Sequence, residues 1–262
     1  MAAEFTTILG RLVEQFDHVW LLFAGVFLRM GAVAFLAPGI GELSVPPRVR
    51  LAAAMALTII VAPAITPPAI GESATALGAL LVGEIVAGLL IGFSLRLSIF
   101  IFQIFGAIAA QSLSITQLFG PGLGHDQESP LATIFISAGL ALACAAGLHV
   151  KVALALIETY EMIPFGVVAN SGETADFIVR QSAKALSLTL GLAAPFVLIG
   201  MAYSAALAAS NRAMPQMAAV FVGAPAIALA GLMLVAGASW AVLSRWSEFS
   251  SALFIAPLAG LP

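Results

Sequence analysis

An apolar run from about Thr75 to Ala110 constrains this chain more than any other feature of its sequence. Only two charged residues, Glu84 and Arg96, fall within it. A helix that crosses a bilayer needs about 20 mostly apolar residues. Only α-helices and closed barrels satisfy their backbone hydrogen bonds in hydrocarbon, and barrel strands alternate in polarity instead of running apolar throughout. The run therefore predicts a membrane helix.

Similar apolar runs recur along the whole sequence. Composition agrees, because 61% of the residues are hydrophobic and 9% are charged, whereas an average soluble domain carries roughly 25% charge. Lipid or a large protein assembly must cover so much apolar surface. We therefore expect an all-α integral membrane protein, with 1–262 forming a single domain of about six hydrophobic helices. The expected helices cover about 20–36, 49–65, 75–110, 130–157, 182–210 and 217–243.

The segment before the first expected helix lacks the basic region and cleavage site of a signal peptide. We expect a short amphipathic lead-in that stays on the mature protein. Lys and Arg residues divide too evenly between the two predicted sides to set the orientation. Gly and Pro residues within the expected helices predict bent helices in a dense protein environment, because small residues permit close approach and Pro kinks a helix.

Several charged residues lie within the expected helices or at their ends. Glu84 is either a relay or substrate-binding carboxylate, or a buried acid bonded to a neighbouring helix or subunit. Arg48 and Arg50 follow a Pro-Pro pair and are typical of anchors at the membrane interface. Glu158 and Glu161 share one helix face, which is either a solvated helix end or an acidic edge that faces a partner.

Motifs for catalysis and cofactor binding are missing from the sequence. The three histidines, His18, His125 and His149, have no metal-ligand spacing. No phosphate-binding glycine loop and no nucleophile elbow occur. The net charge of −3 and the lack of a basic tract give nucleic-acid binding no support. We expect a protein that is not an enzyme and that holds neither a cofactor nor a metal.

Four segments, taken in order, resemble segments of one protein family. The first, 27–63, has an arginine–glycine helix, a Pro/Gly turn and the entry PPRVR, and the second, 83–97, begins Gly-Glu and continues with spaced glycines. The third, 145–166, ends in an Ile-Pro pair and a Gly, and the fourth, 211–232, contains MPQM followed by VGAP. Together they resemble the FliR export-gate family, which includes the equivalent subunit of virulence type III secretion systems.

The resemblance implies a core subunit of the bacterial flagellar type III export gate, a channel for unfolded flagellar subunits. It implies bent helical hairpins, FliP-like and FliQ-like partners, and an FlhB-like protein at the cytoplasmic mouth. The implied location is the inner membrane, within the flagellar basal body. Structural or subunit contacts are then expected at the family's motif positions, which are Pro46, Arg48, Arg50, Glu84, Pro164, Gly166, Pro215, Gln216, Gly223 and Pro225.

The segment 111–130 is too polar for lipid and unusually apolar for an exposed loop. Loops longer than about 12–15 residues without structure of their own are uncommon and often functional. The segment is either an exposed connector or, as the resemblance implies, a plug inside the pore, hinged by its glycines and able to exclude ions by dewetting. The expected plug residues are Leu113, Ile115, Leu118, Phe119, Gly120, Pro121 and Gly122.

Three other functions stay open at this point. A small-solute secondary transporter would have an inverted repeat and unwound helices at the membrane midplane, and no convincing repeat relates the two halves of the sequence. A scaffold subunit without contact to the channel is a second alternative. The gate subunit of a virulence secretion system is the third.

Overall fold

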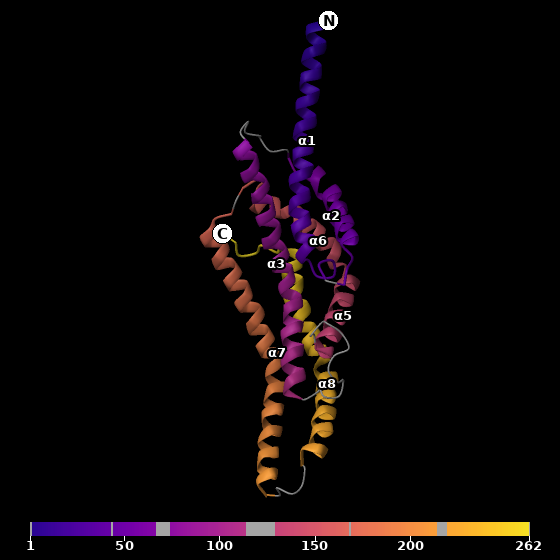
Figure 1. The fold of residues 1–262 in the computed structure, drawn as a ribbon, viewed down its shortest axis with the longest axis vertical. Coiled ribbons are helices and arrows are strands. Elements are labelled where there is room, and N and C mark those ends of the chain that lie inside the picture. The colour runs from indigo at the N-terminus through magenta and orange to yellow at the C-terminus, as the bar shows by residue number, and fades with distance from the viewer. Residues whose placement is uncertain are drawn as a thin grey trace. The chain divides into compact units, whose positions relative to one another are not determined.

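The computed structural model describes residues 2–42, 44–66, 74–113, 129–167, 169–213 and 219–261. Within these ranges the chain is built of helices and contains no strand, which confirms the all-α prediction (Figure 1). The helices are α1 (Ala2–Leu36), α2 (Pro47–Val61) with a short 3-10 helix, η1 (Ala62–Ala64), α3 (Ala74–Ser112), α5 (Pro130–Ala145), α6 (Leu148–Met162), α7 (Ser171–Ala213) and α8 (Ala219–Ile255).

Several helices extend beyond the apolar runs that predicted them. The first helix begins at Ala2 and not near Trp20, α7 begins at Ser171, and α8 continues to Ile255. Apolar length measures the part of a helix that suits lipid, while the backbone hydrogen bonds continue into polar residues. The sequence therefore predicted these helices correctly and their ends poorly.

The fourth expected helix, 130–157, is wrong as one element. The chain forms α5 and α6 instead, and they meet at a bend of 75°. Gly147 lies between them with φ of 67°, a left-handed conformation that ends a helix and that glycine adopts at low cost. At the start of α5, the Ser129 side chain accepts a hydrogen bond from the Ala132 amide at 3.1 Å, a standard N-cap.

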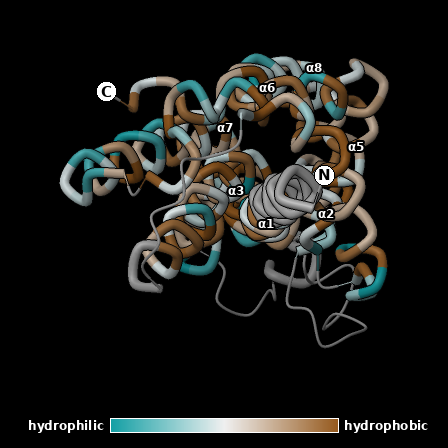
Figure 2. The backbone as a smooth tube through the Cα atoms, turned by 90° about the horizontal axis from the view of Figure 1, so that it is seen from above, coloured by the Kyte–Doolittle hydropathy of each residue, from teal (hydrophilic) through white to brown (hydrophobic). Residues whose placement is uncertain are grey.

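Among the described residues, five helices are long and apolar enough to cross a membrane, and the bent pair α5–α6 makes a sixth if it counts as one span. Of the residues in the membrane-length window of α3, 67% are buried within the chain itself. The corresponding share is 22% for α2 and for α8. Hydrophobic positions recur along the helices in Figure 2. Most of the apolar surface of α2 and α8 is therefore left for lipid or for other proteins.

The chain divides into two compact units. The first comprises Met1–Arg96, Gly147–Arg180 and Ser251–Pro262, and the second comprises Leu97–Ala146 and Gln181–Ser250. In the first unit, α1 packs along α2, and α2 also contacts α6. The C-terminal segment joins this unit through a hydrogen bond of 3.2 Å from Arg180 to the carbonyl of Gly260.

Aromatic side chains from four helices form the core of the second unit. Phe102 and Phe105 of α3 meet Phe135 of α5, Phe196 of α7 and Trp246 of α8, with ring centres 4.9–5.7 Å apart. The indole nitrogen of Trp246 donates to the carbonyl of Ser98 at 2.7 Å. Aromatic pairs at such separations stabilise a core beyond the area they bury.

Candidate functional site

The central polar feature of the first unit is an ion pair between Arg29 of α1 and Glu84 of α3. Arg29 Nε donates to Glu84 Oε2 at 2.8 Å and Arg29 Nη2 donates to Oε1 at 3.0 Å. Both side chains are fully buried. This two-pronged geometry is the strongest arrangement that a guanidinium and a carboxylate form.

Two other donors complete the surroundings of the Glu84 carboxylate. The hydroxyl of Tyr160 in α6 donates to Oε2 at 3.1 Å, and the backbone amide of Gly166 donates to Oε1 at 2.7 Å. Arg29 also donates to the carbonyl of Ile163 at 3.1 Å, and its guanidinium lies 3.7 Å from the centre of the Tyr160 ring. We call these five residues the Glu84 cluster.

Backbone close approach allows the Glu84 cluster to form. A side chain on Gly88 would collide with the carbonyl oxygen of Arg29, and one on Gly83 would lie 3.2 Å from the carbonyl oxygen of Gly166. Gly166 itself has φ of 75°, in the left-handed region that favours glycine. The glycines bring α3 against α1 and against the turn after α6, so that Glu84 reaches both.

The hydrogen bonds of Glu84 tie three segments of the first unit together. A carboxylate has about four lone-pair sites, and Glu84 accepts four hydrogen bonds from the chain itself. Of the two alternatives for Glu84, the geometry favours the structural one, in which the carboxylate fastens the 163–166 turn to α1 and α3.

A second ion pair fixes the turn between α1 and α2. Arg96 of α3 donates to both carboxylate oxygens of Glu42, at 2.6 and 3.3 Å. Arg50, in the first turn of α2, donates to the carbonyl of Glu42 at 2.5 Å. The side chains of Arg96 and Glu42 are both partly exposed. Exposed ion pairs contribute little to the free energy of unfolding.

The family model described as "Bacterial export proteins, family 1" matches residues 20–253. The chain belongs to that family. One relative is the flagellar biosynthetic protein FliR of Caulobacter vibrioides, 30% identical over 227 residues that cover 85% of this chain and 90% of the relative. Another is the FliR of Escherichia coli, 27% identical over 221 residues, which cover 83% and 84%.

No group of three or more His, Cys, Asp or Glu side chains in the described residues is arranged to hold a metal ion. The multi-pass helices suit a membrane export component. The resemblance found in the motifs is thereby confirmed as a family relationship.

Three of the expected contact residues lie close together in the structure. Glu84, Pro164 and Gly166 meet around the Glu84 cluster and its turn. Arg50 joins the separate Glu42 contact, while Pro46 and Arg48 are exposed. In the second unit, Gly223 approaches Tyr203 and Leu207 so closely that a side chain there would collide with the Tyr203 hydroxyl. Pro225 is exposed within α8.

Of the expected plug residues, only Leu113 is described. It is fully buried, and its amide donates to the carbonyl of Ala109 at 3.2 Å, directly after the last turn of α3. The other positions lie outside the described residues, and so do two of the expected contact positions. These are Ile115, Leu118, Phe119, Gly120, Pro121, Gly122, Pro215 and Gln216.

Sequence reasoning missed the partners of Glu84. Arg29 lies in the resembling segment 27–63, but its partner is 55 residues away on another helix, so no sequence spacing links the two. The roles of Tyr160 and of the Glu42–Arg96 pair were not predicted. One signal was available in the sequence. Two opposite charges in separate apolar runs are expected to form an ion pair, because an unpaired charge in an apolar environment is costly.

Proposed function

We propose that this chain is a core subunit of the flagellar type III protein export gate. The observation that carries the proposal is the family match over residues 20–253, together with two FliR relatives aligned over most of both chains. Both of these relatives are flagellar biosynthetic proteins, which favours a flagellar role over a virulence system. The role is the passage of unfolded subunits through a membrane, not a chemical reaction.

The proposal includes partners and a location. FliP-like and FliQ-like membrane proteins form the channel with this chain, and an FlhB-like protein lies at its cytoplasmic mouth, in the bacterial inner membrane at the flagellar basal body. Support comes from the exposed apolar side chains of α2 and α8, which include Ile59, Met233 and Trp240. Other membrane subunits cover such faces as readily as lipid does.

The first experiment tests the assembly. The chain is purified in mild detergent after co-expression with FliP-like and FliQ-like proteins, and the composition of the product is measured by native mass spectrometry. We expect a complex that contains all three components. Recovery of this chain only as a monomer or homodimer would contradict the gate and favour a solute carrier.

The plug is part of the same proposal. Both ends of the segment 114–128 are fixed within the second unit, because Leu113 is buried at the end of α3 and Ser129 caps α5. A Cβ on Gly200 of α7 would collide with the carbonyl oxygen of Ser112, so α7 packs tightly against this end of α3. A segment with fixed ends and a glycine-rich middle is suited to swing within a channel.

Deletion of 114–123 tests the plug and keeps Leu113 in place. We expect proton leakage through the resting inner membrane to rise, because the apolar seal is lost, while the level of the chain is retained. A matched control replaces Gly120 and Gly122 with alanine, which leaves the apolar residues present but stiffens the segment. If the deletion leaves the membrane as tight as the wild type, the segment is an exposed connector.

A further inference from the structure

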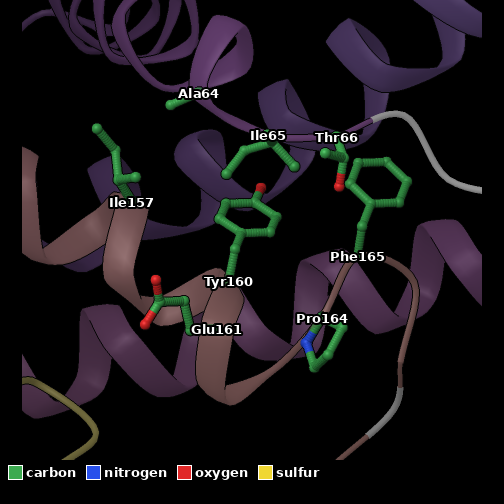
Figure 3. Close-up of a pocket in the computed structure, with 8 residues that line it drawn as sticks. All are labelled: Ala64, Ile65, Thr66, Ile157, Tyr160, Glu161, Pro164 and Phe165. Atoms are coloured by element: carbon green, nitrogen blue, oxygen red, sulfur yellow. The ribbon is translucent and has the colours of Figure 1, made fainter.

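A groove opens on the first unit beside the Glu84 cluster (Figure 3). It has a volume of about 220 Å³. Tyr160 lies at its centre, with Ile65 and Phe165 nearby in the view of Figure 3. The groove is lined by Ala64, Ile65, Thr66, Ile157, Tyr160, Glu161, Pro164 and Phe165.

The lining of the groove combines apolar and aromatic side chains with the polar residues Thr66 and Glu161. The Tyr160 hydroxyl is bonded to Glu84, the ring covers Arg29, and the rings of Tyr160 and Phe165 stack with centres 6.4 Å apart. A dry protein cavity of about 150 Å³ is large enough for a benzene molecule. The groove therefore has room for one aromatic or branched aliphatic side chain.

The rim of the groove is acidic. Glu161 lines it, and Glu158 lies one helical turn earlier on the same face of α6. Both are exposed, and neither belongs to any of the ion pairs found among the described residues. The same helix also exposes Val150 and Leu154. Uncompensated carboxylates beside exposed apolar side chains are costly against hydrocarbon, so the face is poorly suited to lipid.

We propose that this groove receives an apolar side chain of another subunit of the export gate, and that an adjacent Lys or Arg of that subunit pairs with Glu158 and Glu161. The apolar part of the contact follows from the lining of the groove, and the basic part follows from its rim. Buried apolar anchors surrounded by complementary charges are typical of specific protein interfaces. The inference rests on the proposed function and adds to it a partner chemistry at a defined place.

Charge reversal tests the acidic rim in the assembled complex. We expect Glu158→Lys together with Glu161→Lys to lower co-purification of the partner subunits about tenfold. The introduced lysines would repel the Lys or Arg of the partner that Glu158 and Glu161 are proposed to bind. The level of the chain in the membrane stays unchanged, since both residues are exposed. The control is Glu173→Lys, a charge reversal at an exposed position of α7 that is not among the lining residues, and it is expected to retain the partners. Equal recovery from the double variant and the control would overturn the proposal.

Filling the groove tests the apolar part. Ile157→Trp places a ring in the groove and is expected to reduce partner recovery. Val179→Trp, at an exposed position of α7 that is not among the lining residues, is not expected to reduce it. A photoreactive phenylalanine analogue in place of Glu161 then locates the contact within the complex. Reversal of the cross-linked Lys or Arg of the partner to Glu is expected to restore binding to the Glu158→Lys, Glu161→Lys chain. Cross-links to lipid alone would overturn the proposal.

Wild-type chain analysed in parallel separates the two levels of inference. If the wild type is not recovered with FliP-like and FliQ-like proteins, the proposed function fails. If the wild type assembles and all groove variants assemble equally well, the function stands and only the groove proposal fails.

Discussion

Four hydrogen bonds of the first unit meet at the carboxylate of Glu84. Glu84→Ala leaves the Arg29 guanidinium buried without its partner, which costs about 3–5 kcal/mol. We expect the variant to be depleted several-fold from the membrane fraction, because even 1–2 kcal/mol changes abundance in cells to that extent. Immunoblots of membranes and thermal aggregation of the detergent-solubilised chain measure the effect.

A double variant separates structure from function at this pair. Replacing both members of a buried ion pair with apolar residues of similar size is often neutral, so Arg29→Met with Glu84→Leu is expected to recover part of the lost stability and to export. Recovery is incomplete because the Tyr160 hydroxyl and the Gly166 amide lose their acceptor. A double variant that assembles normally and yet does not export would show that export uses the Glu84 charge.

Gly166 makes a separate prediction about the turn after α6. Its φ of 75° disfavours any side chain, and a Cβ there would lie 2.6 Å from Leu80 Cγ. We expect Gly166→Ala to lower the thermal stability of the purified chain, because both backbone strain and overpacking result. The control, Gly31→Ala within α1, meets no atom within 4 Å and is expected to be neutral or slightly stabilising. Equal melting temperatures of the two variants would contradict the inference that the tight turn at Gly166 stabilises the chain.

Among the elements, α8 places one tryptophan in the core and one at the surface. Trp246 is 1% exposed and stacks on Phe102, whereas Trp240 is 81% exposed. Trp246→Ala is expected to cost about 3–5 kcal/mol, while an exposed substitution such as Trp240→Ala stays within about 0.5 kcal/mol. Thermal unfolding of the isolated chain in detergent compares them. Comparable losses from the two variants would mean that the aromatic core is not formed as described.

The helices were predictable because long apolar runs admit few other structures in a membrane. The break at Gly147 was not, since glycine also occurs within unbroken membrane helices and apolar residues resume beyond His149 and Lys151. Pairings between helices were also hidden, because the Arg29–Glu84 contact depends on close approach at Gly88 and not on any sequence spacing. The motif resemblance predicted Glu84 and Gly166 as separate contact positions. The hydrogen bond between them, from the Gly166 amide to the Glu84 carboxylate, is seen only in the structure.

For the whole molecule, the decisive quantity is the apolar surface that the chain does not bury itself. The membrane-length windows of α7 and α8 are 28% and 22% buried within the chain, against 67% for α3. If other subunits cover these faces, the chain made alone lacks part of its stabilising contacts, and binding to the folded state raises stability by mass action. We therefore expect its steady-state level to rise several-fold when FliP-like and FliQ-like proteins are co-expressed. A chain that is equally abundant and monodisperse alone would indicate that lipid, and not protein, covers α7 and α8.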